Sequence, residues 1–311
     1  MTSLPRKPIA AASNTSFMIT RESRVQICAE TVNPAALEND SDRDSLGDVQ
    51  KTLLIPLYFR AKETKRPNRL FEDRRAVEIL PKIQCDFFGY DRAWALEADV
   101  VVRTVIFDDL VRHFIERYPN GQIINLGCGL DARFDRLDNG LIQWFDLDMP
   151  DSIALRQKFI QPSERNTVID QSMFDTGWLE RCEAEVPTLI VAEALFFYFE
   201  RQRVEDLLIQ LHHHFTTAEL LFQSVSPGIV GRQESVPVLR ETRAELRWGV
   251  RSGRELEGWY PGLQFIDEWS LVDHHVDRWR WYRYARGFPW LGRYLREVMK
   301  ITHMRFVDVD G

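Results

Sequence analysis

The sequence predicts an α/β fold built on a doubly wound, mostly parallel sheet of seven strands, with a helical cap inserted late in the chain. Two observations lead to this expectation. Short apolar runs alternate with amphipathic helical patterns along most of the chain. The first strong apolar run also ends in Gly127-Cys128-Gly129, a turn typical of ligand-binding α/β sheets. Together they indicate a Rossmann-like domain whose ligand site lies where the strands end.

The individual elements follow from the two hydrophobic periods, alternation for strands and helical spacing for helices. The longest helical pattern lies within residues 93–118 and ends at Pro119-Asn120-Gly121. Further helices are expected at residues 71–82, 150–159 and 200–215. Strands are expected at residues 122–126, 141–147, 167–169, 188–192, 219–225, 263–272 and 304–309.

The chain divides into an arm, a domain and an insertion within that domain. Residues 1–50 are polar and lack a periodic pattern, which predicts a mobile N-terminal arm, and residues 51–311 form the domain. Residues 226–260 break the strand–helix alternation and are expected to form a helical cap over the carboxyl edge of the sheet. One face of a helix there would carry three arginines, Arg243, Arg247 and Arg251. They would either orient an anionic acceptor or form a solvated stripe.

Composition narrows the classes of partner. The net charge of −7 argues against nonspecific binding to nucleic acid or to an anionic membrane. The four cysteines are widely spread with no C-x-x-C pair, so we expect no metal site and no disulfide framework. We see no signal peptide and no membrane-spanning stretch, and we therefore expect a cytoplasmic location. The oligomeric state stays open.

Acidic residues at the next strand end indicate a nucleoside ligand. Asp146 and Asp148 follow the glycine turn by about twenty residues, where a carboxylate can accept hydrogen bonds from ribose hydroxyls. Gly127, Gly129 and Ala132 loosely fit a dinucleotide fingerprint. However, Asp131 would repel a pyrophosphate at the following helix N-terminus. S-adenosylmethionine has no phosphate and carries cationic groups, so the sequence favours it.

Four motifs carry a resemblance to a known family: NLGCGLDAR, WFDLDMP, SMFDxxWL and VAEALFFY. They resemble the leucine carboxyl methyltransferase family, and most closely its bacterial branch of polyketide-synthesis O-methyltransferases. That family consists of class I S-adenosylmethionine-dependent enzymes, and the resemblance extends over about residues 51–311. It implies a methyltransferase of secondary metabolism with this cofactor.

The resemblance also implies roles for individual residues. Glu193 would face the methionine ammonium, which agrees with the cost of burying an unpaired carboxylate at the end of an apolar strand. Ser172 stands where the protein-methylating branch has an Asp, and this departure points towards a small-molecule acceptor. The remaining cofactor contacts would be Gly127 and Gly129 at the methionyl part, Asp148 with Asp146 nearby at the ribose, Ser172 and Met173 at the adenine, Arg103 at the methionine carboxylate, and Arg60 in the place of a cofactor-binding Lys.

Tyr198 is the candidate catalytic residue, because an aromatic face or hydroxyl close to Glu193 would meet the sulfonium. No general-base pair stands out, which favours a carboxylate acceptor that is already ionised at neutral pH. Two alternatives remain. The cofactor's own amine could displace its thioether to form azetidine-2-carboxylate, or the chain could be a cofactor-binding interaction protein without catalysis.

Overall fold

We describe the protein from a computed structural model, which covers residues 48–83, 90, 93–215, 217–230, 245–280, 284 and 288–308. The expected arm falls almost entirely outside these residues. Its last three positions belong to the first helix, α1 (Asp48–Thr64), so the folded body begins slightly earlier than expected. Within the described ranges, none of the helices has the length and apolar character needed to span a membrane.

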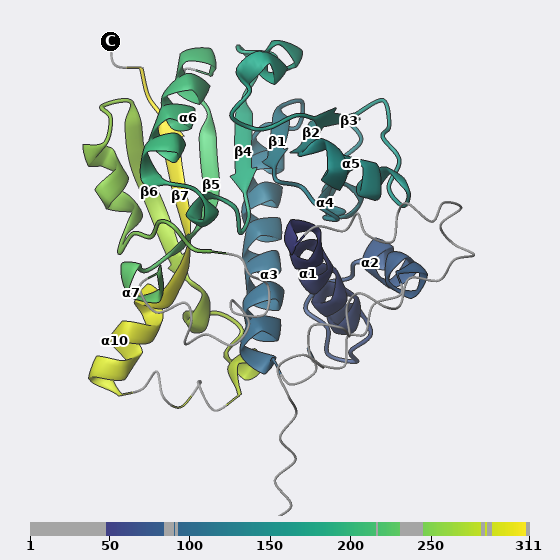
Figure 1. Ribbon diagram of the computed structural model, residues 1–311, viewed down its shortest axis with the longest axis vertical. Coiled ribbons are helices and arrows are strands. Elements are labelled where there is room, and N and C mark those ends of the chain that lie inside the picture. The colour runs from purple at the N-terminus through teal and green to yellow at the C-terminus, as the bar shows by residue number, and fades with distance from the viewer. Residues whose placement is uncertain are drawn as a thin grey trace, which may run out of the picture.

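The expected seven-stranded sheet is confirmed (Figure 1). Its spatial order is β3-β2-β1-β4-β5-β7-β6, and the pairs among the first five strands are parallel. The strands are β1 (Gln122–Leu126), β2 (Gln143–Asp148), β3 (Asn166–Asp170), β4 (Thr188–Ala192), β5 (Glu219–Val225), β6 (Leu263–Ser270) and β7 (Met299–Phe306). Since β1 lies between β2 and β4 at the point where the strand order reverses, the β1 end is the expected ligand position.

Helices cover both faces of the sheet because successive strand residues point to opposite sides. Ile123 packs on the side of α3 (Trp94–Arg117), whereas Ile124 packs on the side of α6 (Arg201–His214). The other helices are α2 (Arg74–Ile79), α4 (Arg133–Leu137), α5 (Pro150–Gln157), α7 (Pro227–Val230) and α10 (Pro289–Val298). Both faces of the sheet are therefore packed against helices.

Four strands differ from their expected boundaries: β3 is one residue longer at each end, β6 ends at Ser270 where a 3₁₀ turn begins, and β2 and β7 start at other residues. β2 begins at Gln143 rather than residue 141, because Asn139 Oδ1 accepts hydrogen bonds from the backbone N–H groups of Leu141 and Ile142 and holds them in a turn. β7 begins at Met299 rather than residue 304, because it pairs along its whole length between β5 and β6. The alternation of apolar and polar residues is broken at Thr302-His303, and tertiary pairing turns this weak local signal into a strand.

The described part of the insertion carries short helical segments, and its role as a cap remains a proposal. These segments are α7 and the 3₁₀ helix η7 (Gly253–Gly258). Residues 245–252, which precede η7, form no regular element. Leu246, Trp248 and Val250 are buried, while Arg247 and Arg251 between and after them are exposed. The helical face predicted for the arginines is therefore wrong for Arg247 and Arg251, and Arg243 lies outside the described residues. The alternating E-L-R-W-G-V-R pattern was the overlooked signal of extended chain.

Candidate functional site

The ends of four parallel strands bring the candidate cofactor residues to one edge of the sheet. Gly127 and Gly129 follow β1, Asp148 ends β2, Ser172 and Met173 come shortly after β3, and Glu193 follows β4. Because these strands are adjacent and parallel, their carboxyl ends share an edge, and Asp148 and Glu193 flank the β1 turn. The predicted placement along one edge is confirmed, and the role of each residue remains proposed.

The β1 turn depends on its glycines for backbone reasons. Gly127 and Gly129 have φ angles of 63° and 47°, in the left-handed region that favours glycine. A Cβ on Gly127 would lie 2.8 Å from Leu195 Cδ1, and one on Gly129 would lie 2.8 Å from Leu53 Cδ2. The closest neighbours of both glycines are therefore leucines of the protein itself. Positive φ and this close packing suffice to explain the residue choice.

The two aspartates of β2 have different environments. Asp148 is half-buried, and its carboxylate accepts from the backbone N–H of Gly129 at 2.7 Å and of Met149 at 2.8 Å. Burial raises the pKa of Asp148, while these N–H groups act in the opposite direction. The carboxylate is thus held against the β1 turn while part of it still meets solvent, as a ribose contact requires.

Asp146 serves the interior of the protein instead. It is 1% exposed and accepts from Arg156 Nη2 at 2.5 Å, Asn125 Nδ2 at 3.0 Å and Trp144 Nε1 at 3.0 Å. These donors occupy the carboxylate, so the geometry does not favour the expected cofactor contact. Arg156 in turn donates to the carbonyl oxygens of Gly129 and Asp131. Asp146 therefore stabilises the turn through Arg156.

The β3 end offers polar atoms in a short turn. Ser172 is half-buried, and its Oγ accepts from the backbone N–H of Phe174 at 3.3 Å. The Met173 side chain is packed in the core, and its carbonyl oxygen accepts from Trp178 Nε1 at 3.2 Å. Any adenine contact from this turn would come from Ser172 or from backbone atoms rather than from an exposed Met173 side chain.

Glu193 and Arg103, predicted as a pair of opposite charges, are in direct contact. Arg103 Nε donates to Glu193 Oε1 at 2.8 Å, and Arg103 Nη1 donates to Asp99 Oδ2 at 2.6 Å. No hydrogen bond to a described residue uses Arg103 Nη2, which leaves a donor for a ligand carboxylate. Ala194, directly after Glu193, has a φ of 51°, so the chain bends sharply where it presents this carboxylate.

Tyr198 lies beside this charged pair. It ends the 3₁₀ helix η5 (Phe196–Tyr198), and its ring packs edge-on against Phe197 with centroids 4.7 Å apart. Burial raises the pKa of Tyr198, while nearby Arg103 acts to lower it. The hydroxyl therefore stays protonated at neutral pH and cannot serve as a ready general base. Phe196 is fully buried in the core, so these aromatics do not form a complete cage.

A second arginine on Glu193 was not anticipated from the sequence. Arg133, the first residue of α4, is 1% exposed and donates from Nη2 to Glu193 Oε2 at 2.6 Å. Although burial alone would raise the pKa of Glu193, Arg133 and Arg103 hold it below its usual value. Glu193 is therefore charged at neutral pH. Since a carboxylate has about four acceptor positions and the arginines use two, a ligand ammonium can still bind.

α1 covers the β1 turn. Arg60 donates from Nε to Asp73 Oδ2 at 2.8 Å and from Nη2 to the carbonyl oxygen of Leu130 at 2.9 Å. It is 3% exposed and fastens the helix to the turn. A direct cofactor contact for Arg60 remains a hypothesis, whereas its role in holding α1 over the site follows from its hydrogen bonds.

The ends of the insertion pack beside the same edge. Arg247 and Val250 donate backbone hydrogen bonds to the carbonyl oxygens of Phe197 and Val225, both at 2.8 Å. An apolar cluster joins the insertion to the ends of β4 and β5, and it comprises Phe197, Val225 and Leu246 with Ala194, Tyr198, Ile229, Val230 and Met299 around them. The region next to Tyr198 is thus apolar, in contrast to the charged cofactor side.

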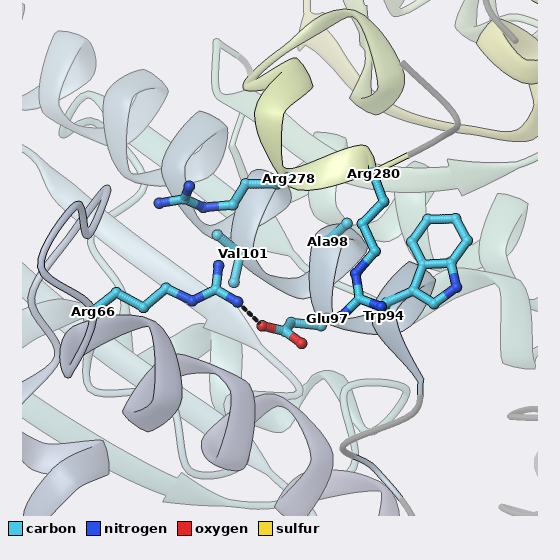
Figure 2. A pocket seen from close by; sticks show the side chains of 7 residues that line it. All are labelled: Arg66, Trp94, Glu97, Ala98, Val101, Arg278 and Arg280. Atoms are coloured by element: carbon cyan, nitrogen blue, oxygen red, sulfur yellow. Dashed lines mark hydrogen bonds and ion pairs between the residues drawn. The ribbon is translucent and has the colours of Figure 1, made fainter. Parts of the chain in front are cut away.

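A small pocket lies on the other side of α3 (Figure 2). Its lining includes Trp94, Glu97, Ala98 and Val101, which share one helical face, whereas Asp99 and Arg103 point in the opposite direction. Arg66 forms an ion pair with Glu97 there. This pocket is therefore separate from the strand-end site. Among the residues that the structure describes, no group of acidic, histidine or cysteine side chains is arranged to hold a metal ion.

Comparison with known proteins decides the family. The profile of the leucine carboxyl methyltransferase family matches residues 54–212. The chain is 31% identical over 229 residues to the tetracenomycin polyketide synthesis O-methyltransferase TcmP of Streptomyces glaucescens, covering 73% of this chain and 85% of that protein. The chain belongs to the leucine carboxyl methyltransferase family. It is an S-adenosylmethionine-dependent methyltransferase, as the sequence predicted.

Other relatives agree with this assignment. The methyltransferase is 29% identical over 285 residues to the S-adenosyl-L-methionine-dependent methyltransferase dpfgK of Gibberella zeae, covering 83% of this chain and 92% of that protein. Among solved structures, a DUF574 family protein from Streptomyces avermitilis superposes with a TM-score of 0.54 at 12% identity, covering 83% of this chain and 97% of that one. This structural likeness supports the class I methyltransferase fold alone.

The residues present fit S-adenosylmethionine as the cofactor. Asp148 would accept from the ribose hydroxyls, Glu193 would bind the ammonium, and Arg103 has a donor left for the carboxylate. The Asp131 carboxylate in the β1 turn accepts hydrogen bonds from Arg133 and Arg136 and is therefore paired within the protein. The donor set matches a zwitterionic methionyl group better than a phosphate.

Proposed function

We propose that the protein is an O-methyltransferase that acts on a small-molecule acceptor, an aromatic carboxylic acid of the polyketide type. The observation that carries this proposal is the likeness to TcmP, which extends over 85% of that protein. TcmP is named as a tetracenomycin polyketide synthesis O-methyltransferase. The apolar cluster beside Tyr198 supports an acceptor with a hydrophobic body.

When bound, S-adenosylmethionine supplies an electrophilic methyl group on its sulfonium. The protein's contribution is orientation and exclusion of water. Glu193 and Arg103 hold opposite charges a few ångströms apart for the methionyl end, and Asp148 fixes the ribose at the neighbouring strand end. α1 and the ends of the insertion close the edge from two sides, which favours reaction in a desolvated space.

The choice of a carboxylate acceptor follows from the groups near Tyr198. Tyr198 is protonated at neutral pH, and the Asp99 carboxylate is occupied by Arg103 Nη1 at 2.6 Å and by Gln223 Nε2 at 3.2 Å. Neither is placed to remove a proton from a phenol. A carboxylic acid is already ionised at neutral pH and needs no such base.

Product analysis tests this proposal. The protein is incubated with S-adenosylmethionine and with ring-matched pairs of aromatic carboxylic acids and phenols, followed by mass spectrometry. Methyl esters of the acids together with S-adenosylhomocysteine are the expected products, and the Glu193→Gln variant is the control. Methyl ethers of the phenols would replace the carboxylate assignment. Azetidine-2-carboxylate with methylthioadenosine, or no turnover with any acceptor, would contradict the proposed function.

A further inference from the structure

Arg133 makes three ion pairs at once, one with each of its side-chain nitrogens. Nε donates to Asp108 Oδ1 at 2.7 Å, Nη1 donates to Asp131 Oδ2 at 2.7 Å, and Nη2 donates to Glu193 Oε2 at 2.6 Å. The guanidinium also lies 5.5 Å from the centre of the Phe107 ring. A planar, three-sided fork of this kind is fixed in orientation as well as in position.

These partners come from three different parts of the fold. Asp108 lies on α3, Asp131 lies in the β1 turn, and Glu193 follows β4. Arg133 itself opens α4, directly after the turn. One side chain therefore ties the glycine turn after β1 to the carboxylate that follows β4, and this side chain is only 1% exposed.

We propose that Arg133 is a positioning residue for the cofactor, holding the Glu193 carboxylate ionised and turned towards the ammonium of S-adenosylmethionine. Arg103 alone occupies only Oε1, and without Arg133 the carboxylate would be free to rotate and would lose its second counter-charge. This inference rests on the proposed assignment of Glu193 to the ammonium.

The other charged groups around Glu193 define how this role appears in a pH profile. The cations that contact it are Arg103 on α3 and Arg133 on α4, while Asp131 opposes them. Asp99 is a further carboxylate that interacts with both Arg103 and Glu193, and Tyr198 interacts with Arg103. Removing Arg133 removes the nearest cation, so the pKa of Glu193 should rise, and the anion that binds the ammonium should be lost as the pH falls.

Arg136 provides a matched control. It lies on the same short helix, is buried to a similar degree, and also pairs with Asp108 and Asp131, at 2.9 Å and 3.2 Å. Its remaining partner is Asp73, at 3.0 Å, rather than Glu193. A variant at Arg136 therefore removes an equal charge from the same network without touching Glu193.

The test is calorimetric titration of S-adenosylmethionine into wild type, Arg133→Met and Arg136→Met between about pH 5.5 and about pH 7.5, where both the ligand ammonium and an unpaired carboxyl can titrate. Dividing each affinity by that of wild type at the same pH removes the ligand's own titration. Without Arg133 the pKa of Glu193 should rise towards this range, so Arg133→Met is expected to lose affinity relative to wild type as the pH falls, by about twofold or more from the top to the bottom of the range. Arg136→Met should stay parallel to wild type, and adenosine should bind all three proteins without this pH dependence.

Two further variants keep the outcome decisive. If Arg133→Met does not fold, Arg133→Lys is used, whose single ammonium cannot reach all three carboxylates and should give a smaller loss in the same direction. Parallel pH profiles for the Arg133 and Arg136 variants would overturn the inference and leave Arg133 a purely structural residue. Unchanged S-adenosylmethionine affinity in Glu193→Gln would instead overturn the assignment of Glu193 itself.

Discussion

Replacing Arg103 by glutamine should weaken S-adenosylmethionine binding strongly. The Arg103 side chain is 7% exposed, and it bridges Asp99 at 2.6 Å and Glu193 at 2.8 Å. Loss of one partner of a buried, hydrogen-bonded charge pair costs about 2–5 kcal/mol of binding, which corresponds to about 30-fold or more in affinity. The free energy of unfolding should fall as well, by up to about 3–5 kcal/mol, because buried Asp99 loses its cation and Glu193 keeps only Arg133.

Calorimetric titration with S-adenosylmethionine and with adenosine separates the methionyl contribution from the rest. Arg103→Gln should lose affinity for S-adenosylmethionine while adenosine, which lacks the methionyl charges, binds as in wild type. Thermal melting of the free protein reports the loss in stability independently.

Arg117→Gln is the matched control on the same helix. Arg117 pairs with Glu219 of β5 at 2.8 Å, but its side chain is 51% exposed and lies at the opposite end of the sheet. A solvent-exposed pair of this kind contributes at most about 1 kcal/mol, and the cofactor affinity should not change. Equal losses for adenosine and S-adenosylmethionine in Arg103→Gln would refute the assignment of Arg103 to the methionyl end.

Three further variants or measurements address the remaining parts of the site. Asp148→Asn should weaken adenosine and S-adenosylmethionine by a similar factor, since both carry the ribose; an effect confined to S-adenosylmethionine would exclude the ribose role. Gly127→Val should abolish cofactor binding in calorimetry, because the φ of 63° and the contact with Leu195 force the turn to move, at a strain of about 1–2 kcal/mol. Retained affinity in that variant would show that the turn tolerates a side chain. S-adenosylhomocysteine should protect residues 245–258 and α1 from hydrogen exchange if they close over the site, and unchanged exchange in both would argue against a cap.

The sequence by itself determined the strands that carry the site and the identity of their terminal residues. Buried strands such as β1 and β4 are short apolar runs, and the glycines and acids that end them interrupt that pattern visibly. Parallel strand ends must share an edge, so Asp148 and Glu193 could be placed together before any coordinates were known. The family motifs coincide with these same positions, which is why fold and cofactor were both predictable.

The tertiary structure decided which charged residues face the ligand and which face the protein. Asp146 and Asp148 are two residues apart on one strand, yet Asp146 is fully buried and paired with Arg156, whereas Asp148 is only partly buried. The segment around Arg247 is likewise extended rather than helical, because its backbone donates hydrogen bonds to Phe197 and to Val225 at the end of β5.

Arg133 is the clearest case. In the sequence it is one of several arginines after a glycine turn, and no local pattern distinguishes it from Arg136. Its partners Asp108 and Glu193 lie 25 and 60 positions away in the chain, and they meet only when α3, α4 and β4 pack together. Strand patterns are local consequences of burial, whereas the pairing of buried charges depends on long-range geometry, because each ion pair exists only after the elements that carry its partners have assembled.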